Sequence, residues 1–509
     1  LLFENIPGKI QSKKEISKDG YKGLDIVNKT KTGDFQRYQI IFTPINVIIF
    51  KMGGKNEFVQ QEGDKFFDQV KLTEQGKSWE SVSTIKKDFK VKLPQYYHIR
   101  NNTKATSLYG HPEIEAYDKK TNNYYFLKRA SLYDHYFIEK DKFELKRIAD
   151  KFCKELNIDS VDKVMLKDAK YPTVLAYART ADSSYLSLKI VVKGANYYLL
   201  ANVSPSYTKS NEFFESFELQ NFDYTFKFEN KTDSIMNFSV NSNFLSPDPY
   251  GQMVEKGYEK RRNRKEKEDK SFLRKRETET YFSENFERVN VEYVKFHMYK
   301  QINHVDSLWN EEIRDFELEE SVKLTNRKQT EVNGVHSLEV VFMDTNSTRT
   351  IEKKYITNGS YVYVLTANLD SLSKRSKYVN QFFTTFKPLG EKESNSVFVD
   401  KPEMFFNALE KGDSLAKERA LQSVSSYIRF KEKDAEKLMS VISNYPFPTK
   451  HIEAKEQMIK DLGKLKNPVI LPFLTDLYTK MEDTAMYQLA VLKALSLQKN
   501  KKASKTFVQ

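Results

Sequence analysis

The chain repeats one segment three times. Each copy predicts two strands joined by a turn, followed by a polar stretch that closes on a pair of phenylalanines. The copies span residues 38–50, 185–201 and 349–367, and the closing pairs are Phe66-Phe67, Phe213-Phe214 and Phe382-Phe383. The copies share a pattern of apolar residues, but they share no set of polar residues at matching positions. A repeat of this kind is typical of an assembly of packing modules rather than of one catalytic site.

The length of the chain allows several domains. Its 509 residues, 39% hydrophobic and 13% aromatic, suffice for three or four globular units of about 150 residues each. We expect a first module over residues 1–78, a second over 84–220, a third over 222–390 and a helical region over 398–509. The first module lacks the upstream strands of its siblings, so we expect a fragment that begins inside a domain. The longest apolar run, residues 40–50, is too short and interrupted to span a membrane, so we expect no transmembrane segment.

The second copy is the most complete and defines the unit. Its expected helix, residues 143–156, carries an apolar stripe that we expect to be buried together with the single cysteine, Cys153. The stripe consists of Phe143, Ile148, Phe152 and Leu156. Strands are expected at residues 88–94, 114–117, 123–128, 163–167, 173–179, 185–193 and 197–203. The pattern predicts an antiparallel sheet backed by helices, an α+β sandwich.

The third copy repeats this order around a larger interruption. The interruption, residues 246–283, is highly charged and is predicted to be an insertion within the module rather than a linker. Asn358-Gly359 predicts a type I′ hairpin. Strands are expected at residues 224–228, 291–299, 322–324, 337–343, 348–356 and 361–367. The expected helix, residues 304–316, turns four apolar side chains toward the sheet, namely Leu308, Trp309, Ile313 and Phe316.

Short motifs in these copies resemble domains of the PsbP/Mog1-like α/β sandwich class. The motifs are Phe89-x-Val91-x-Leu93-Pro94, the closing Phe213-Phe214-x-Ser216-Phe217, and Phe382-Phe383-Thr384-Thr385-Phe386. The resemblance covers roughly residues 1–390 and implies a fold of tandem antiparallel-sheet sandwich modules. It carries little information about function, because unrelated functions share one fold.

After residue 398 the hydrophobic period becomes helical. Helices are expected at residues 405–409, 416–430, 434–442, 452–465, 469–480 and 484–497. Small residues are expected at their packing positions, namely Ala420, Ala485, Ala490 and Ala494. This region resembles a short HEAT-like solenoid, which implies a concave surface that faces another protein.

No residue pattern predicts catalysis. The seven histidines have no metal-ligand spacing, and no Walker loop, Gly-x-Gly-x-x-Gly, Gly-x-Ser-x-Gly or His-Glu-x-x-His motif occurs. The acidic pair Glu311-Glu312 falls on a helix surface, where a solvated face is the ordinary role. We therefore expect no enzyme, no cofactor and no metal. Tyrosines on the strands are expected to pack in the core, with an outward groove as the alternative.

The net charge of +13 is mostly lysine spread along the chain, and one stretch is an exception. Lysines are interleaved with acids along most of the chain, which indicates a solvated surface, but residues 255–280 carry eleven basic residues against seven acids. This stretch is a mobile insertion or an anion-binding arm. The candidate anion-binding residues are Lys260, Arg261, Arg262, Arg264 and Lys265.

A three-residue pattern, Asp-Ser/Thr followed by an aliphatic residue or alanine, occurs six times. It resembles the O-glycosylation acceptor of exported Bacteroidota proteins, and the alternative is that Asp-Ser/Thr simply caps helices. The candidate acceptors are Ser160, Ser234, Ser307, Ser371, Ser414 and Thr484. The resemblance implies export to the periplasm or the outer membrane.

These observations together favour a non-enzymatic scaffold or accessory protein of the bacterial cell envelope. Its expected partners are other envelope proteins in an outer-membrane complex, in transport, secretion or gliding, and no nucleic acid is expected. The alternative from a different class is a polyanion- or nucleic-acid-binding protein that uses residues 255–280 as its arm.

Overall fold

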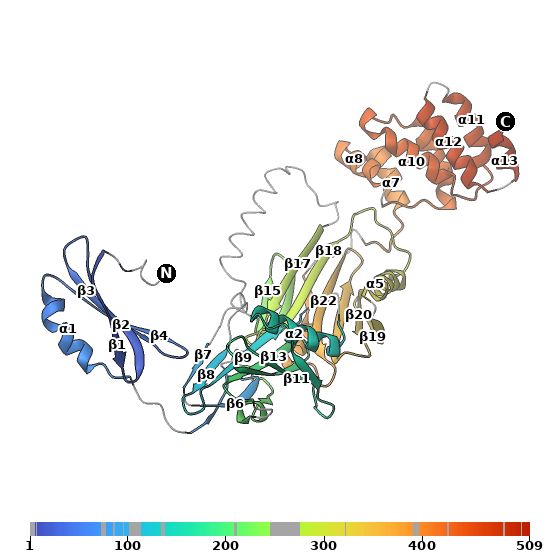
Figure 1. The fold of residues 1–509 in the computed structure, drawn as a ribbon. Coiled ribbons are helices and arrows are strands. Elements are labelled where there is room, and N and C mark those ends of the chain that lie inside the picture. Colours follow the sequence, from blue (N-terminus) through green and yellow to red (C-terminus); the bar gives the residue numbers. More distant parts are fainter. Residues whose placement is uncertain are drawn as a thin grey trace.

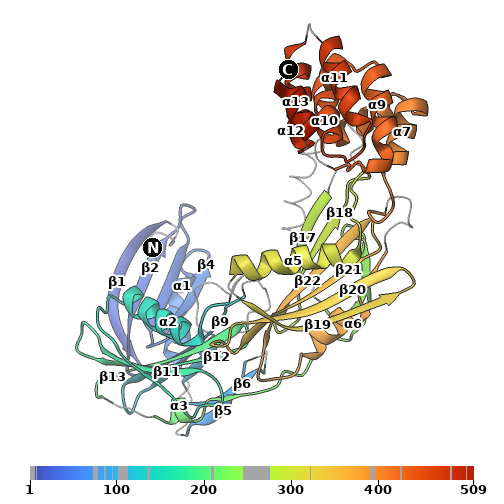
Figure 2. The ribbon, with the colours of Figure 1, turned by 90° about the vertical axis from the view of Figure 1, so that its right-hand side faces the viewer.

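The computed structural model is an elongated arrangement of antiparallel sheets with helices packed on them, followed by a helical region (Figures 1 and 2). It describes residues 6–508 except residues 7, 73–77, 85–86, 95, 101–112, 134–137, 208–210, 245–274, 321, 390–395, 425–426, 482–483 and 500. The sheets are antiparallel, and helices dominate the C-terminal part. The predicted α+β class is therefore confirmed. None of the helices in the described residues is long and apolar enough to cross a membrane.

The first module is a four-stranded meander with one helix against it. Its elements are β1 (Lys9–Lys18), β2 (Tyr21–Lys29), β3 (Phe35–Phe42), β4 (Val47–Gly54) and α1 (Phe58–Gln69). Asp19 and Gly20 both have positive φ, +50° and +83°, so this two-residue connection has the backbone of a type I′ turn. In α1, Phe67 is buried while Phe66 is 43% exposed. The predicted closing pair therefore contributes only one ring to the core here.

The second module has a large and a small sheet. The large sheet has the order β10-β11-β12-β13-β9-β8-β7, and the small one β14-β6-β5. The strands are β5 (Glu80–Val82), β6 (Phe89–Leu93), β7 (Tyr97–Ile99), β8 (Ile114–Asp118), β9 (Asn123–Ser131), β10 (Asp162–Met165), β11 (Thr173–Arg179), β12 (Tyr185–Lys193), β13 (Asn196–Ser204) and β14 (Glu218–Leu219). Helix α2 (Asp141–Glu155) packs on one face of the large sheet, and α3 (Glu212–Glu215) packs on the other.

The buried face of α2 differs from the prediction. Phe143 is 54% exposed and Leu156 46% exposed, whereas Ile148 is buried and Phe152 half-buried. The stripe that faces the sheet consists of Leu145, Ile148, Ala149 and Cys153. Phe143 lies five residues before Ile148, which is about 140° away around the helix. Leu156 follows the last helical residue. The prediction that Cys153 is buried is confirmed, at 1% exposure.

The third module repeats the build of the second. Its large sheet has the order β17-β18-β22-β21-β20-β19, and its small sheet β15-β16-β23. The elements are β15 (Glu229–Asp233), β16 (Phe238–Ser242), β17 (Lys275–Phe282), β18 (Arg288–Lys295), α5 (Val305–Glu320), β19 (Lys323–Val332), β20 (Val335–Met343), β21 (Arg349–Thr357), β22 (Tyr361–Asp370), α6 (Lys377–Thr385) and β23 (Lys387–Pro388). All four apolar side chains predicted to face inward from α5 are buried.

Three predictions for this module are wrong. Residues 224–228 are not a strand, because the amides of Thr225 and Phe226 donate to the Glu284 carboxylate, at 2.7 and 3.1 Å, instead of to a neighbouring strand. The charged insertion does not extend to residue 283, because β17 pairs with β18 as the edge of the sheet. Asn358-Gly359 is not a type I′ turn, because only its glycine has positive φ, +93°.

The helical region has a single core. Its helices are α7 (Pro402–Lys411), α8 (Ser414–Ser423), α9 (Ala435–Asn444), α10 (Ile452–Leu462), α11 (Ile470–Lys480), α12 (Ala485–Leu497) and α13 (Lys501–Val508). Ala420, Ala490 and Ala494 are fully buried at helix contacts, but Ala485 is exposed because it is the first residue of α12. The predicted helix over residues 416–430 ends at Ser423.

One polar contact recurs in all three modules. The Lys189 ammonium on β12 donates to the carbonyl of Phe214, and Lys354 on β21 donates to that of Phe383, both at 2.6 Å. Lys18 reaches the carbonyl of Phe67 in the same way. A lysine thus satisfies the carbonyl of the second phenylalanine at or near the end of each closing helix, where cations are favoured. The lysine comes from the third strand of the meander in the second and third modules, but from the first strand, β1, in the first module.

Candidate functional site

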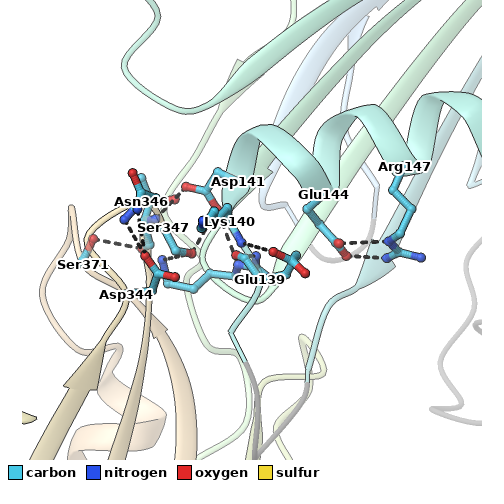
Figure 3. A network of polar contacts seen from close by, with 11 residues as sticks. Glu139, Lys140, Asp141, Glu144, Arg147, Asp344, Asn346, Ser347 and Ser371 are labelled. Atoms are coloured by element: carbon cyan, nitrogen blue, oxygen red, sulfur yellow. Dashed lines mark hydrogen bonds and ion pairs between the residues drawn. The ribbon is translucent and has the colours of Figure 1, made fainter. Parts of the chain in front are cut away.

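Buried polar groups gather where the modules meet. The first turn of α2 lies against a loop of the third module (Figure 3). The Asp141 carboxylate, 5% exposed, accepts from the Ser347 hydroxyl at 3.1 Å and from the Thr348 amide at 2.6 Å. The Arg349 guanidinium, 4% exposed, lies 3.5 Å from the same carboxylate and donates to the Glu139 carbonyl. The carboxylate is neutralised and fully engaged, so it joins two modules rather than serving as a base.

A second link lies on the other side of the second module. The Arg129 guanidinium and the Asp88 carboxylate, both 6% exposed, are 3.1 Å apart. Tyr198 donates to Asp88 at 2.7 Å, and Arg129 donates to the carbonyl of Asn285 in the third module at 3.0 Å. Burial and the Asp88 charge raise the pKa of Tyr198 well above its usual range, so the phenol stays protonated.

The third module meets the helical region through aromatic rings and a buried lysine. The ring of His297 stacks on that of Tyr427 with centroids 3.9 Å apart, and Tyr299 packs edge-on against Phe405. His297 is 2% exposed, and burial, followed by the nearby positive charge of Lys401, lowers its pKa to about 4. The histidine is therefore neutral at pH 7. The ring therefore serves as a packing surface for Tyr427 at this junction.

Lys401 is the least expected residue of this junction. Its side chain is 0% exposed, and its ammonium has no hydrogen-bond partner among the described residues. Burial lowers its pKa to about 8. No sequence motif marks this lysine, since it lies between a polar segment and the proline that begins α7. The only hint is its position directly before Pro402.

A cavity of about 420 Å³ lies beside the small sheet of the third module. Its walls are formed by seven residues, namely Thr225, Phe226, Lys227, Glu229, Lys231, Asn243 and Phe244. The Lys231 ammonium donates to the Phe244 carbonyl at 2.8 Å and lies 4.9 Å above its ring. The candidate anion-binding residues Lys260, Arg261, Arg262, Arg264 and Lys265 lie outside the described residues.

The six candidate glycosylation sites are scattered over separate elements. Ser160, Ser234, Ser307, Ser371 and Ser414 are exposed, and Thr484 is half-buried. Three of the preceding aspartates cap the backbone. Asp233 accepts from the amides of Ile235 and Met236, at 2.9 and 2.8 Å. Asp370 accepts from the amide of Leu372 at 2.9 Å, and Asp413 accepts from that of Ala416 at 2.8 Å. Capping thus accounts for the aspartates at these sites but not for the hydroxyl residues that follow.

Within the described residues, no group of three or more His, Cys, Asp or Glu side chains is placed to hold a metal ion. No family model and no curated protein matches the chain. Among solved structures, a core factor of S. cerevisiae aligns over 99% of this chain and 75% of its own, at 10% identity and a TM-score of 0.07. This value is too low to support a common fold.

Proposed function

We propose that this chain is a non-enzymatic scaffold or accessory protein of the bacterial cell envelope that binds protein partners in an outer-membrane complex. The observation that carries the proposal is that the buried charged side chains lie at or near contacts between modules. Asp141, Arg349, Asp88 and Arg129 all bind groups at or near contacts between modules. Removing one partner of a buried ion pair leaves an uncompensated charge, so these pairs support a role in holding packed units together.

The finer identity of the units belongs to the same proposal. The sandwich modules are of the PsbP/Mog1-like class, supported by the meander that leads to an aromatic closing helix in each copy. The helical region is a HEAT-like repeat, supported by neighbouring helices that share one core through Ala490 and Ala494. Five exposed acceptor serines support glycosylation after export and hence a periplasmic or outer-membrane location.

Affinity capture from the native membrane fraction tests this proposal. Mass spectrometry should recover outer-membrane proteins with the chain and glycans on Ser160 or Ser307. A control chain with alanine at both serines should keep the partners and lose the glycans. Recovery with cytosolic proteins alone, or turnover of a substrate by the purified chain, would contradict the proposal.

The second candidate is polyanion binding, favoured by the two lysines, Lys227 and Lys231, in the walls of the cavity in the third module. It requires that the affinity for a polyanion falls steeply as the salt concentration rises. This salt dependence should disappear when the eleven basic residues of 255–280 are replaced with neutral ones. Binding of heparin or DNA that is insensitive to this neutralisation would exclude it.

A further inference from the structure

Each module contains a four-stranded meander, formed by β1–β4, β10–β13 and β19–β22. In the second and third modules the last strand of the meander carries a further antiparallel strand on its outer side. β9 pairs there with β13, and β18 pairs with β22. In the first module β4 pairs with β3, and no described strand pairs with its other side. The outer edge of β4 is therefore the place where the other two modules continue their sheets.

The register shows that β4 corresponds to β13 and β22. The lysines of β12 and β21 that bind the closing helices pair with Leu200 and Leu365. In the first module Lys18 donates to the Gln39 side chain at 3.2 Å, and Gln39 pairs with Phe50. Phe50 is therefore the counterpart of the two leucines, which lie in the cores beneath α3 and α6.

The flank of α1 that lies above the edge of β4 is apolar and exposed. Arg37 on β3 binds Asp64, which marks the flank turned toward the middle of the sheet. Phe66 lies about 160° from Asp64 around the helix, and Phe58 shares its flank. These two rings are 43% and 48% exposed, and the Phe58 ring lies against Gly54 at the end of β4.

An added strand covers this flank in the other modules. The first phenylalanine of each closing pair is fully buried there, and Phe213 packs on the Tyr125 ring of β9 with centroids 5.2 Å apart. Tyr125 and Leu127 of β9 belong to the core beneath α3, and Val289 and Val291 of β18 belong to the core beneath α6. In both modules the covering element is thus an antiparallel strand with apolar residues two positions apart.

β4 itself has the pattern of such a strand. Ile48 and Phe50 lie two positions apart, on the same face as Met52, which pairs with Arg37 beneath α1. Two other long outer strands, β1 and β19, carry four and three basic residues, which discourage pairing with another chain. β4 carries one, Lys51. β4 therefore combines an open edge with the apolar pattern that β9 and β18 show.

The β3–β4 hairpin determines which main-chain groups of β4 are free to pair. The Thr43 amide donates to the Asn46 carbonyl at 2.9 Å across the turn. Hydrogen-bonded pairs alternate along an antiparallel ladder, so the main-chain groups of Val47 and Ile49 point away from β3. The Tyr96 side chain engages the side chains of the two turn residues, which precede this stretch.

We propose that β4 pairs with β4 of a second copy of this chain, antiparallel and about a two-fold axis that passes beside Ile49. The register brings together three kinds of pair, namely Ile49 with its own copy, Phe50 with Ile48, and Lys51 with Val47. It sets an aliphatic residue against Phe50 and keeps the two lysines apart. The inference goes beyond the proposed function and does not depend on it.

The two α1 helices then lie on one face of the joined sheet. Each α1 contacts β3 and β4, so the two helix axes are about two strand spacings apart, roughly 10 Å. This is an ordinary distance between packed helices. Phe58 and Phe66, which are exposed in the single chain, face the second copy across this gap.

Charge reversal at the two-fold axis tests the pairing. Light scattering should give twice the mass of one chain. Ile49→Lys and Ile49→Glu each set a charge against its own copy, so each should weaken self-association about tenfold or more. An equimolar mixture of the two variants should restore the dimer, which misfolded variants would not do. Val164→Lys and Val164→Glu, at a 54% exposed valine of the outer strand β10, are the matched controls and should leave the dimer unchanged.

A cross-link tests the register. Residues opposite each other in a hydrogen-bonded antiparallel pair have Cα atoms about 5.5 Å apart, which suits a disulfide. Ile49→Cys should therefore give a covalent dimer when diamide oxidises its thiols, and a reductant should reverse it. The native Cys153 is 1% exposed and should not react. Val332→Cys, at a valine of the third module that is 66% exposed, is the control and should give no dimer.

The inference is overturned if the unsubstituted chain is monomeric at the highest concentration attainable, because the edge is then left to solvent or to a strand of another protein. It is also overturned if the dimer persists in both charged Ile49 variants, or if their mixture stays monomeric. Equal cross-linking of Ile49→Cys and Val332→Cys would overturn it as well.

Discussion

Replacing Lys401 with methionine should stabilise the helical region. The ammonium is fully buried without a hydrogen-bond partner among the described residues, and its pKa falls from the ordinary 10.5 to about 8. A difference of 2.5 pKa units corresponds to about 3 kcal/mol of penalty on the charged form at pH 7. The lysine also precedes the N-terminus of α7, where a positive charge is unfavourable. Methionine keeps the apolar stem, so we expect a gain of about 2–3 kcal/mol.

The pH dependence provides the sharper test. Between pH 8 and 10.5 the unfolded chain still holds the Lys401 proton while the folded chain releases it, so stability should rise with pH across this window. The Lys401→Met variant should lack this rise. Urea unfolding followed by circular dichroism at 222 nm, at pH 7, 8.5 and 10, measures both effects. Lys411→Met, at an exposed lysine at the end of α7, is the control. A Lys401→Met variant that is less stable than the unsubstituted chain at pH 7, or that keeps the pH-dependent rise, would refute the reasoning.

Three further substitutions test other parts of the fold. Lys354→Met leaves the Phe383 carbonyl without its charged donor and should lower the free energy of unfolding by about 2 kcal/mol. Urea unfolding followed by tryptophan fluorescence measures this, and an unchanged midpoint would contradict it. Gly334→Ala, at φ +74°, should destabilise by about 1 kcal/mol in the same assay, whereas Gly53→Ala, with 3.6 Å to its nearest neighbour, should be nearly neutral. Asp141→Asn removes the charge buried at the junction of the second and third modules and should accelerate limited proteolysis there; equal cleavage rates would show that the junction does not depend on it.

Local patterns predicted the strands and helices better than their exact faces. The stripe of α5 could be read from its sequence because Trp309 and its neighbours recur at helical spacing. The face of α2 could not, since Phe143 adds an apolar side chain that the helix turns to solvent. Turn chemistry was misassigned for a physical reason. Asn333-Gly334 joins two strands with both residues at positive φ, +51° and +74°, whereas Asn358-Gly359 belongs to a three-residue connection.

The polar links between modules could not be predicted from the sequence. Asp88 and Arg129 are separated along the chain, and Asn285 lies in another module, so no spacing rule connects them. Lys401 is equally unmarked, because a lysine before a helix is ordinarily a solvated residue. Burial in these cases depends on tertiary packing.

The two interpretations of the Asp-Ser/Thr pattern concern different atoms. The Asp413 carboxylate accepts from the amide of Ala416 and so fixes the start of α8, which any residue after the aspartate would allow. A glycan would instead use the hydroxyl of Ser414, which is exposed. Ser371 differs, because its hydroxyl already donates to the Thr348 carbonyl at 2.9 Å. Capping therefore explains the aspartate of the pattern and leaves the hydroxyl residue after it open to modification. A glycan on Ser371 would have to break the hydrogen bond to Thr348, whereas Ser414 makes no such bond in the structure.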